Sequence, residues 1–403
     1  MLGALLRSII RDGTLIVRGP DGEMYVVGDA RESDAAPIVH IRNHATLARI
    51  ARNPSLAVGE AYMDGGLTIE RGSLYDFLAL AARNMRYLPA RRGLFGRRLR
   101  RPRNPREAAR RNVAHHYDLS GELYRLFLDG DLQYSCAYFP EPGIGLDAAQ
   151  TAKKRHLAAK LLLKPGCRVL DIGSGWGGLA LTLAEEHGAD VFGVTLSAEQ
   201  LDEARRRASR RGLHKRARFE MRDYRDVEGA FDRIVSVGMF EHVGPAHYQA
   251  YFDAIARLLE ADGVALLHTI GRFDGPSGGN PWIEKYIFPG GTIPALSQIM
   301  QAMERSGLIV TDIEVLRLHY ADTLRAWSRR FAANRGRIAA LYDERFCRMW
   351  EFYLAGAEAG FREGALVVFQ VQMAKDRSVV PLTRDYITDF DRAHAPGVRY
   401  AAE

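Results

Sequence analysis

The C-terminal two thirds of this 403-residue sequence predict an α/β fold built on a doubly wound parallel sheet. Two observations carry the prediction. Short apolar runs alternate with amphipathic helical segments from residue 167 onward, and a glycine-rich turn follows the first of these runs. The central runs are apolar on both faces, as the strands of a buried parallel sheet are. Because the chain is longer than one hydrophobic core usually organises, we expect a second, smaller domain before this sheet.

The expected strands and helices follow one another in regular alternation. The strands are expected over 167–172, 190–195, 217–221, 231–237 and 264–270, and the main helices over 177–187, 197–211 and 246–260. In such sheets ligands bind beyond the carboxyl ends of the strands. The residues that directly follow each strand are therefore the first candidates for a functional site.

A strongly basic segment separates the two expected domains. Residues 83–111 carry twelve arginines against one acid, Glu107, and prolines interrupt any helical pattern there. We expect domains over 1–85 and 112–403, joined by an Arg-rich linker over 86–111. So dense an arginine cluster favours a polyanionic partner over a merely solvated linker. An anionic membrane surface is favoured over nucleic acid, because the segment has few aromatic residues and no nucleic-acid-binding motif.

Cysteine use and hydropathy indicate a cytoplasmic protein. The three cysteines, Cys136, Cys167 and Cys347, are too few for a disulfide framework, and their spacing matches no zinc-ligand pattern. No apolar stretch approaches the roughly 20 residues of a membrane span, and the N-terminus lacks the features of a secretory signal.

The glycine-rich turn, LDIGSGWGG over 170–178, offers bare backbone to a ligand. It formally satisfies the dinucleotide motif G-x-G-x-x-G, but a dinucleotide also needs an acid at the end of the second strand to hold the ribose. That strand ends instead in Thr195, Leu196 and Ser197. S-adenosylmethionine needs less: the glycine turn, Asp171 to orient it, and polar groups such as Thr195 and Gln200. We therefore favour S-adenosylmethionine over a dinucleotide and over an unliganded turn.

Two titratable residues stand at the ends of later strands. Glu241 follows the strand over 231–237, and His268 lies near the end of the strand over 264–270. If these strands are neighbours, both side chains reach the ligand side of the sheet. Separately, Glu241 could be a helix N-terminal acid and His268 a core histidine; His242 and Asp171 could also be structural.

Eight stretches together resemble the cyclopropane-fatty-acyl-phospholipid synthases and the related mycolic acid cyclopropane synthases. They are GEAYMDGG (59–66), HYDLS (116–120), YSCAYF (134–139), LDIGSGWGG (170–178), VSVGMFEHVG (235–244), LLHTIG (266–271), PWIEKYIFPGG (281–291) and HYADTLRAW (319–327). The resemblance covers nearly the whole chain. It implies a Rossmann-like S-adenosylmethionine-dependent methyltransferase domain preceded by a smaller N-terminal lipid-binding domain.

The resemblance also implies two groups of site residues. The residues expected around S-adenosylmethionine are Tyr134, Ser135, Asp171, Gly173, Ser174, Gly175, Trp176, Gly177, Thr195, Leu196, Gln200, Tyr224 and Arg225. Those expected around a bicarbonate ion are Cys136, Glu241, His268, Ile270 and Tyr320, with Cys136 and Ile270 acting largely through their backbone. Cys136 and Tyr320 rest on the resemblance alone, whereas Glu241 and His268 also follow from their places after the strands.

The implied reaction adds a methylene group to the cis double bond of an unsaturated phospholipid acyl chain at the inner face of a membrane. The chain departs from the family at Ser174 and at Ala357, where cysteine is usual. Since alanine cannot form a covalent intermediate, either this enzyme is altered or the usual thiol is not required. We favour the second interpretation, because the implied chemistry has no covalent step. Alternatives are a sister enzyme that leaves a methyl or methylene branch, a small-molecule methyltransferase, and a non-catalytic lipid-binding protein. Headgroup, acyl length, double-bond position and oligomeric state stay open, with a homodimer as one candidate.

Overall fold

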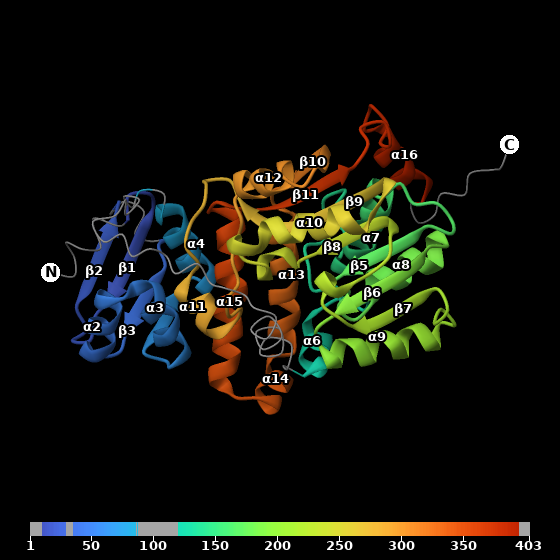
Figure 1. Cartoon of the computed structure of the whole chain (residues 1–403). Helices are drawn as coiled ribbons and strands as arrows, with labels where there is room; N and C mark the ends of the chain where they lie inside the picture. Colours follow the sequence, from blue (N-terminus) through green and yellow to red (C-terminus); the bar gives the residue numbers. More distant parts are fainter. Residues whose placement is uncertain (1–9, 30–34, 86, 88–119, 395–403) are drawn as a thin grey trace. The chain divides into compact units, whose positions relative to one another are not determined.

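The computed structural model describes residues 10–29, 35–85, 87 and 120–394 (Figure 1). The chain divides into two compact units. The first comprises Met1–Arg100, Gly278–Pro289 and Tyr320–Leu366, and the second Arg101–Ser277, Gly290–His319 and Val367–Glu403. None of the helices in these described ranges has both the length and the apolar composition that crossing a membrane requires.

The first unit contains a small mixed sheet with the strand order β2-β1-β3-β4. Its strands are β1 (Thr14–Arg18), β2 (Met24–Gly28), β3 (Ile38–Ile41) and β4 (Leu67–Arg71). Strand β1 runs antiparallel to β2 and parallel to β3, and β3 runs antiparallel to β4. Alternate residues such as Leu15, Val17 and Val39 point into one core, where they meet Phe77 and Leu80.

Helices from two distant parts of the sequence build the rest of this unit. They are α2 (His44–Arg52), α3 (Pro54–Met63), α4 (Leu74–Met85), α11 (Pro281–Tyr286), α13 (His319–Ala333), α14 (Arg335–Leu341) and α15 (Glu344–Arg362). Helix α15 packs on α3 and α4, and α11 packs on α3. Each of the expected domains, 1–85 and 112–403, is one continuous stretch of the sequence. The first unit instead combines helices from late in the chain with the N-terminal sheet. Apart from Tyr87, the expected linker 86–111 lies outside the described residues.

The second unit is the doubly wound α/β domain that the sequence predicts. Its seven strands have the order β10-β11-β9-β8-β5-β6-β7. They are β5 (Arg168–Ile172), β6 (Asp190–Thr195), β7 (Ala217–Met221), β8 (Phe231–Val237), β9 (Leu259–Arg272), β10 (Ile309–Leu316) and β11 (Leu366–Ala374). The strands from β5 to β9 pair in parallel, while β10 and β11 pair antiparallel at one edge.

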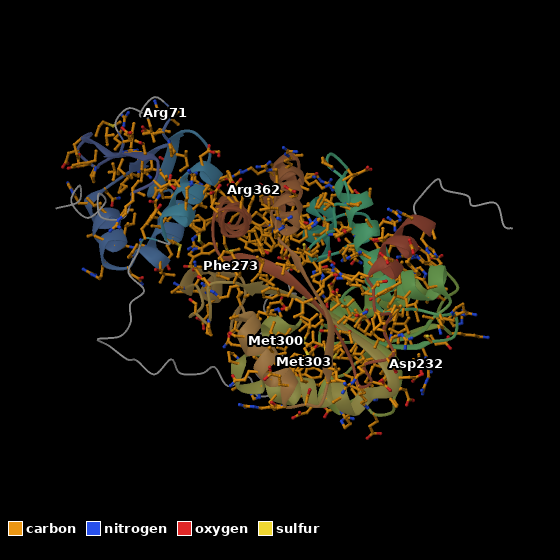
Figure 2. The ribbon with its side chains drawn as sticks, turned by 90° about the horizontal axis from the view of Figure 1, so that it is seen from above. Arg71, Asp232, Phe273, Met300, Met303 and Arg362 are labelled. Carbon is orange, nitrogen blue, oxygen red and sulfur yellow. The ribbon has the colours of Figure 1, made fainter. Side chains whose placement is uncertain are left out.

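Helices cover both faces of this sheet (Figure 1). They are α6 (Gly121–Phe127), α7 (Leu146–Lys160), α8 (Gly178–His187), α9 (Ala198–Arg210), α10 (Tyr248–Leu258), α12 (Leu296–Glu304) and α16 (Asp385–Ala393). Successive residues of a strand point to opposite faces of the sheet and so belong to different cores. Val169 packs with α7, α8 and α9, and Leu170 packs with α10 and α12. Met303 of α12 is fully buried in the latter core, and Met300 packs against it (Figure 2).

Candidate active site

The glycine-rich turn joins β5 to α8, and at one of its positions the backbone is accessible to a ligand. The amides of Gly173 and Ser174 both donate to the Val194 carbonyl, at 2.9 and 3.0 Å, which ties the turn to β6. Gly175 has a φ of +54°, and a Cβ built there would meet nothing within 4 Å. Gly177 has a φ of +81°, but its Cβ would lie 2.8 Å from the Phe219 ring. Gly177 therefore serves packing, whereas Gly175 leaves open space for a ligand.

Two buried polar atoms beside this turn have no protein partner among the described residues. They are Oδ2 of Asp171 and the hydroxyl oxygen of Ser174. Burial raises the pKa of the Asp171 carboxyl to about 7, although the charge of Lys153 acts in the opposite direction. Since buried polar groups are normally paired, these orphaned atoms fit a polar ligand held by the turn.

The end of β6 contributes the next part of the site. The Thr195 hydroxyl donates to Oε1 of the Gln200 side chain at 3.0 Å. The Ser197 hydroxyl caps α9 by accepting a hydrogen bond from the backbone N–H of Gln200. The Trp176 indole donates to Oε2 of Glu199 at 3.1 Å, which joins the glycine turn to the first turn of α9. The structure thus brings the predicted residues Trp176, Thr195 and Gln200 to one edge of the sheet; Leu196 lies between the latter two and is half-buried.

Tyr224 and Arg225 form a short 3₁₀ turn (Tyr224–Asp226) after β7. The Arg225 guanidinium makes two hydrogen bonds to Asp223, at 2.8 and 2.6 Å. The Tyr224 ring lies 5.5 Å from the ring of Tyr251. Arg225 is thus committed to a carboxylate within the chain, and its predicted role toward the cofactor stays a prediction.

The segment Tyr134–Cys136 lies beside the glycine turn through a cluster of aromatic rings. The Tyr124 ring of α6 is 5.3 Å from the Tyr134 ring and 4.9 Å from the Trp176 ring. Cys136 is buried, and its thiol contacts the Ala137 carbonyl at 3.2 Å. These contacts bring YSCAYF and LDIGSGWGG, which are far apart in the sequence, into one site.

Glu241 is buried and only half satisfied. Its Oε1 accepts a hydrogen bond from the Ile270 amide at 2.6 Å, while Oε2 has no partner among the described residues. Burial raises the pKa of this carboxyl to about 7, against the opposing effect of its backbone hydrogen bonds. Glu241 therefore exchanges its proton near neutral pH and has one oxygen available for a ligand.

His268 lies on the strand next to the one that leads to Glu241, because β8 and β9 pair with Val237 opposite His268. This confirms the neighbouring strands that the sequence predicts. Burial holds the pKa of His268 well below its ordinary value, so the ring is neutral. The Gln370 amide lies 3.2 Å from Nδ1. With that amide donating, the ring proton is on Nε2, which can donate to an anion.

Tyr320 belongs to the first unit, where its ring lies 5.8 Å from that of Trp327 and 4.8 Å from that of Phe361. Its expected place beside the ion stays a prediction.

His242, for which the sequence analysis allowed a structural role, is half-buried. Burial lowers the pKa of its ring to about 4.

Two polar residues that hold the segment before Cys136 were not identified from the sequence. Gln150 and Lys153 lie on α7, and both bond to the stretch that begins at Gln133. The sequence contains no clear signal for them. Helix α7 has no well-defined apolar stripe, because residues on most of its faces are buried and several of these are charged.

We expect Glu241→Gln to stabilise the folded chain more at pH 8 than at pH 5. The raised pKa means that folding favours the protonated carboxyl, so this contribution is complete below pH 4.5 and is lost as the pH rises through about 7. The wild type loses about 3 kcal/mol of stability over this pH range. The Glu241→Gln variant loses none from this source, because glutamine does not titrate. Urea denaturation of both proteins at the two pH values measures the difference. A stability difference that does not change with pH would contradict the raised pKa.

Comparisons with known proteins show which family the chain belongs to. Residues 104–371 match the family described as mycolic acid cyclopropane synthetase, and residues 4–88 match a domain of unknown function (DUF7884). The sequence is 40% identical to the cyclopropane-fatty-acyl-phospholipid synthase of Escherichia coli (strain K12) over 86% of this chain and 90% of that protein. It is 39% identical to the tuberculostearic acid methyltransferase UfaA1 of Mycobacterium tuberculosis (strain ATCC 25618 / H37Rv), over 88% of this chain and 86% of that one.

Solved structures show the same likeness in the larger domain. The mycolic acid cyclopropane synthase CmaA1, complexed with SAH and CTAB, matches with a TM-score of 0.62 and 37% identity, over 66% of this chain and 97% of that chain. The cyclopropane synthase MmaA2 from Mycobacterium tuberculosis matches with a TM-score of 0.63 and 32% identity, over 66% of this chain and 98% of that chain.

Proposed function

This chain belongs to the mycolic acid cyclopropane synthetase family, and we propose that it is a cyclopropane-fatty-acyl-phospholipid synthase. It is an S-adenosylmethionine-dependent enzyme, and its proposed substrate is an unsaturated acyl chain of a phospholipid. The observation that carries the proposal is the half-satisfied, buried carboxylate of Glu241 in the 3₁₀ turn Phe240–His242. This turn follows β8, the strand next to β5 and its glycine turn.

The reaction requires a dry site and a base. An isolated cis alkene is a weak nucleophile, which reacts with a sulfonium methyl only when it is held close and in line. As the alkene carbon bonds to the methyl, the methyl–sulfur bond breaks and the neighbouring chain carbon becomes a cation. Loss of one proton from the new methyl closes the ring. The products are a cyclopropane acyl chain, S-adenosylhomocysteine and a proton.

The proposed base is a bicarbonate ion, which would supply a mild oxygen base next to the methyl. The fit rests on the unpartnered Oε2 of Glu241 and the neutral ring of His268. In the proposal, Glu241 accepts the hydrogen bond of the ion and so orients it. His268 would donate to another of its oxygens, and the backbones of Cys136 and Ile270 would lie next to the ion; the expected role of Tyr320 stays a prediction.

S-adenosylmethionine is proposed to lie along the glycine turn and the ends of β6 and β7. The residues proposed to hold it are Tyr134, Ser135, Asp171, Gly173, Ser174, Gly175, Trp176, Gly177, Thr195, Leu196, Gln200, Tyr224 and Arg225. The open space at Gly175 and the orphaned oxygens of Asp171 and Ser174 support this placement.

Product analysis tests the proposed function. The purified chain is incubated with S-adenosylmethionine and vesicles of an unsaturated phospholipid, and the fatty acids are examined by mass and proton spectra. A cyclopropane ring on the acyl chain supports the proposal. A methyl or methylene branch would identify the sister chemistry, and lipid binding without turnover would support a non-catalytic protein; either result overturns the proposal.

The proposed enzyme acts on the inner face of a membrane, where the Arg-rich segment meets anionic lipid. Most of that segment lies outside the described residues. We expect binding to anionic vesicles to weaken as salt rises beyond physiological strength, where the Debye length is about 8 Å. Replacing Arg97, Arg98, Arg100 and Arg101 together by Gln should weaken it too. Sedimentation with anionic and neutral vesicles measures both effects, and binding that neither treatment changes would exclude this role.

Ala357, which replaces the usual cysteine of the family, lies on α15. The proposed reaction has no covalent step on the protein, so Ala357→Cys should leave turnover within a few fold of the wild type. Steady-state assays of both proteins test this. A gain of several hundredfold would show that the missing thiol matters.

A further inference from the structure

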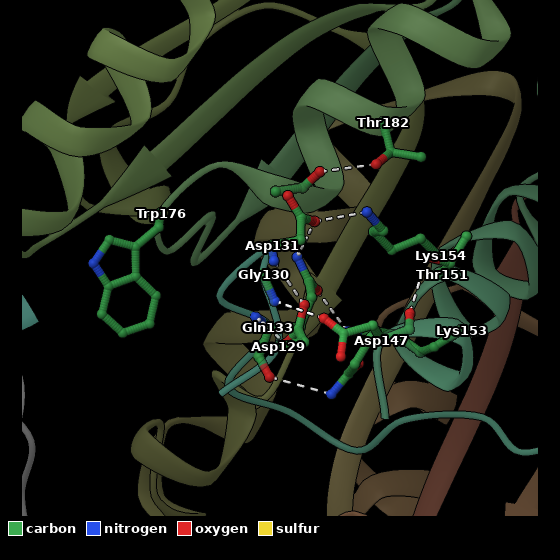
Figure 3. A network of polar contacts seen from close by, with 12 residues as sticks. Asp129, Gly130, Asp131, Gln133, Asp147, Thr151, Lys153, Lys154, Trp176 and Thr182 are labelled. Atoms are coloured by element: carbon green, nitrogen blue, oxygen red, sulfur yellow. Dashed lines mark hydrogen bonds and ion pairs between the residues drawn. The ribbon is translucent and has the colours of Figure 1, made fainter. Parts of the chain in front are cut away.

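Two side chains of α7 hold the segment that carries Ser135. The Gln150 amide donates to the backbone carbonyls of Gln133 and Ser135, at 3.2 and 3.0 Å. One turn further along, Nζ of Lys153 donates to Oε1 of Gln133 at 2.6 Å and to the Ser135 hydroxyl at 2.8 Å. Figure 3 shows Lys153 and Gln133 within this polar network. The segment is thus fixed at its backbone and at its side chains from one helix.

Lys153 is a buried cation with neutral partners. It is 1% exposed, and in the described part of the chain no carboxylate forms an ion pair with it. The other buried lysines of α7 differ. Lys154 lies 2.6 Å from Asp131, and Lys160 forms ion pairs with Glu314 and Asp312. Burying an unpaired charge is costly, so a retained one indicates an anion that arrives with a ligand.

The surroundings of Lys153 also mark it as part of the site. Burial lowers its pKa to about 8, and the charges of Asp129 and Asp131 act in the opposite direction. Its charge opposes the burial that raises the pKa of Asp171 in the glycine turn, and it adds to the burial that lowers the pKa of His268. Lys153 thus acts electrostatically on both the proposed cofactor site and the proposed ion site.

The hydrogen bond between Lys153 and Ser135 has a defined direction. An ammonium group can only donate, so the Ser135 hydroxyl must accept from it. The hydroxyl proton of Ser135 therefore points away from Lys153 and can be donated to a ligand. A hydroxyl group whose oxygen accepts from a buried cation is a suitable hydrogen-bond donor to a carboxylate.

We propose that Lys153 is a positioning residue that orients the Ser135 hydroxyl toward the carboxylate of the methionine part of S-adenosylmethionine. The proposal rests on the proposed function, because that function puts Ser135 beside the cofactor. Bicarbonate offers the same oxyanion chemistry, and the experiment separates the two sources.

The experiment compares two nucleosides that differ in the amino-acid portion. S-adenosylhomocysteine carries the carboxylate, and 5′-methylthioadenosine lacks it. By isothermal titration calorimetry, Lys153→Met should bind S-adenosylhomocysteine roughly tenfold or more weakly, with 5′-methylthioadenosine nearly unchanged. Ser135→Ala should show the same selective loss, and the double variant should be no weaker than either single one, because the two residues act as a unit.

The matched control is Lys160→Met, which removes another fully buried lysine of α7. It should lower the melting temperature without changing the ratio of the two affinities. Should Lys153→Met fail to fold, Ser135→Ala tests the same selective loss with the lysine intact.

Several results would overturn the proposal. Equal losses for both nucleosides would mean a structural role, and additive losses in the double variant would mean that Lys153 does not act through Ser135. Unchanged nucleoside binding with a raised bicarbonate requirement would assign the lysine to the ion instead. A wild-type chain that binds neither nucleoside would overturn the proposed function and this proposal with it, whereas a missing cyclopropane product alone would leave this test intact.

Discussion

Glu241→Gln is expected to lower turnover roughly 100-fold or more, with little change in the affinity for S-adenosylmethionine. Glu241 is the buried carboxylate whose Oε1 accepts from the Ile270 amide and whose Oε2 has no partner among the described residues. Glutamine has nearly the same size, and its oxygen can still accept from Ile270. Its NH₂ group then takes the place of Oε2 and donates where an acceptor is required.

Steady-state turnover and direct titration of the cofactor separate the two effects. Because the glycine turn and Thr195 remain intact, the cofactor should bind as before and the loss should appear in kcat. Glu185→Gln is a suitable control, since Glu185 is an exposed glutamate paired with Arg211. If Glu241→Gln turns over normally, the proton leaves by another route and the proposed site is misassigned.

The sequence predicted the five parallel strands β5 to β9 of the larger sheet, but it did not predict the edge strands β10 and β11 and placed the ends of the helices less well. The helix expected over 246–260 is α10, Tyr248–Leu258, which a 3₁₀ turn over Pro245–His247 precedes and β9 follows directly at Leu259. Hydrophobic periodicity marks the buried middle of an element, whereas its ends depend on local hydrogen bonds that leave little pattern.

The grouping of late helices with the early sheet could not be predicted from local pattern. Gly59 of α3 illustrates why, because a Cβ there would lie 2.4 Å from Nε1 of Trp282 on α11. Glu60 then accepts from Lys285 at 2.7 Å and from Tyr286 at 2.8 Å. These contacts join residues more than two hundred positions apart, and neither stretch alone indicates its partner.

The residues of the candidate site also fall into those that could be predicted from the sequence and those that could not. Glu241 and His268 could be predicted because each stands near the end of an expected strand. Their partners could not: the Ile270 amide is reached only because β8 and β9 are adjacent, and Gln370 comes from β11. Lys153 is the clearest omission, since a lysine in a helix normally implies a solvated face.

Removal of bicarbonate is the other change for which a large effect is expected. In buffer freed of carbon dioxide, turnover should fall at least about tenfold, because no side chain proposed at the site acts as the base itself. Glu241 is held by the Ile270 amide, and His268 is a neutral ring whose Nδ1 accepts from Gln370. Both are thereby suited to hold an ion.

Adding bicarbonate back should restore the rate along a saturation curve, whereas chloride at the same ionic strength should not. Glu241→Gln should need far more bicarbonate to reach its own lower maximum, since the ion would lose the oxygen that orients it. Titration of S-adenosylhomocysteine in both buffers provides the control, because removing the ion should leave cofactor binding unchanged. Turnover that persists at full rate in rigorously degassed buffer would mean that a group of the chain takes the proton, and with its pKa of about 7 Glu241 would be the first to test.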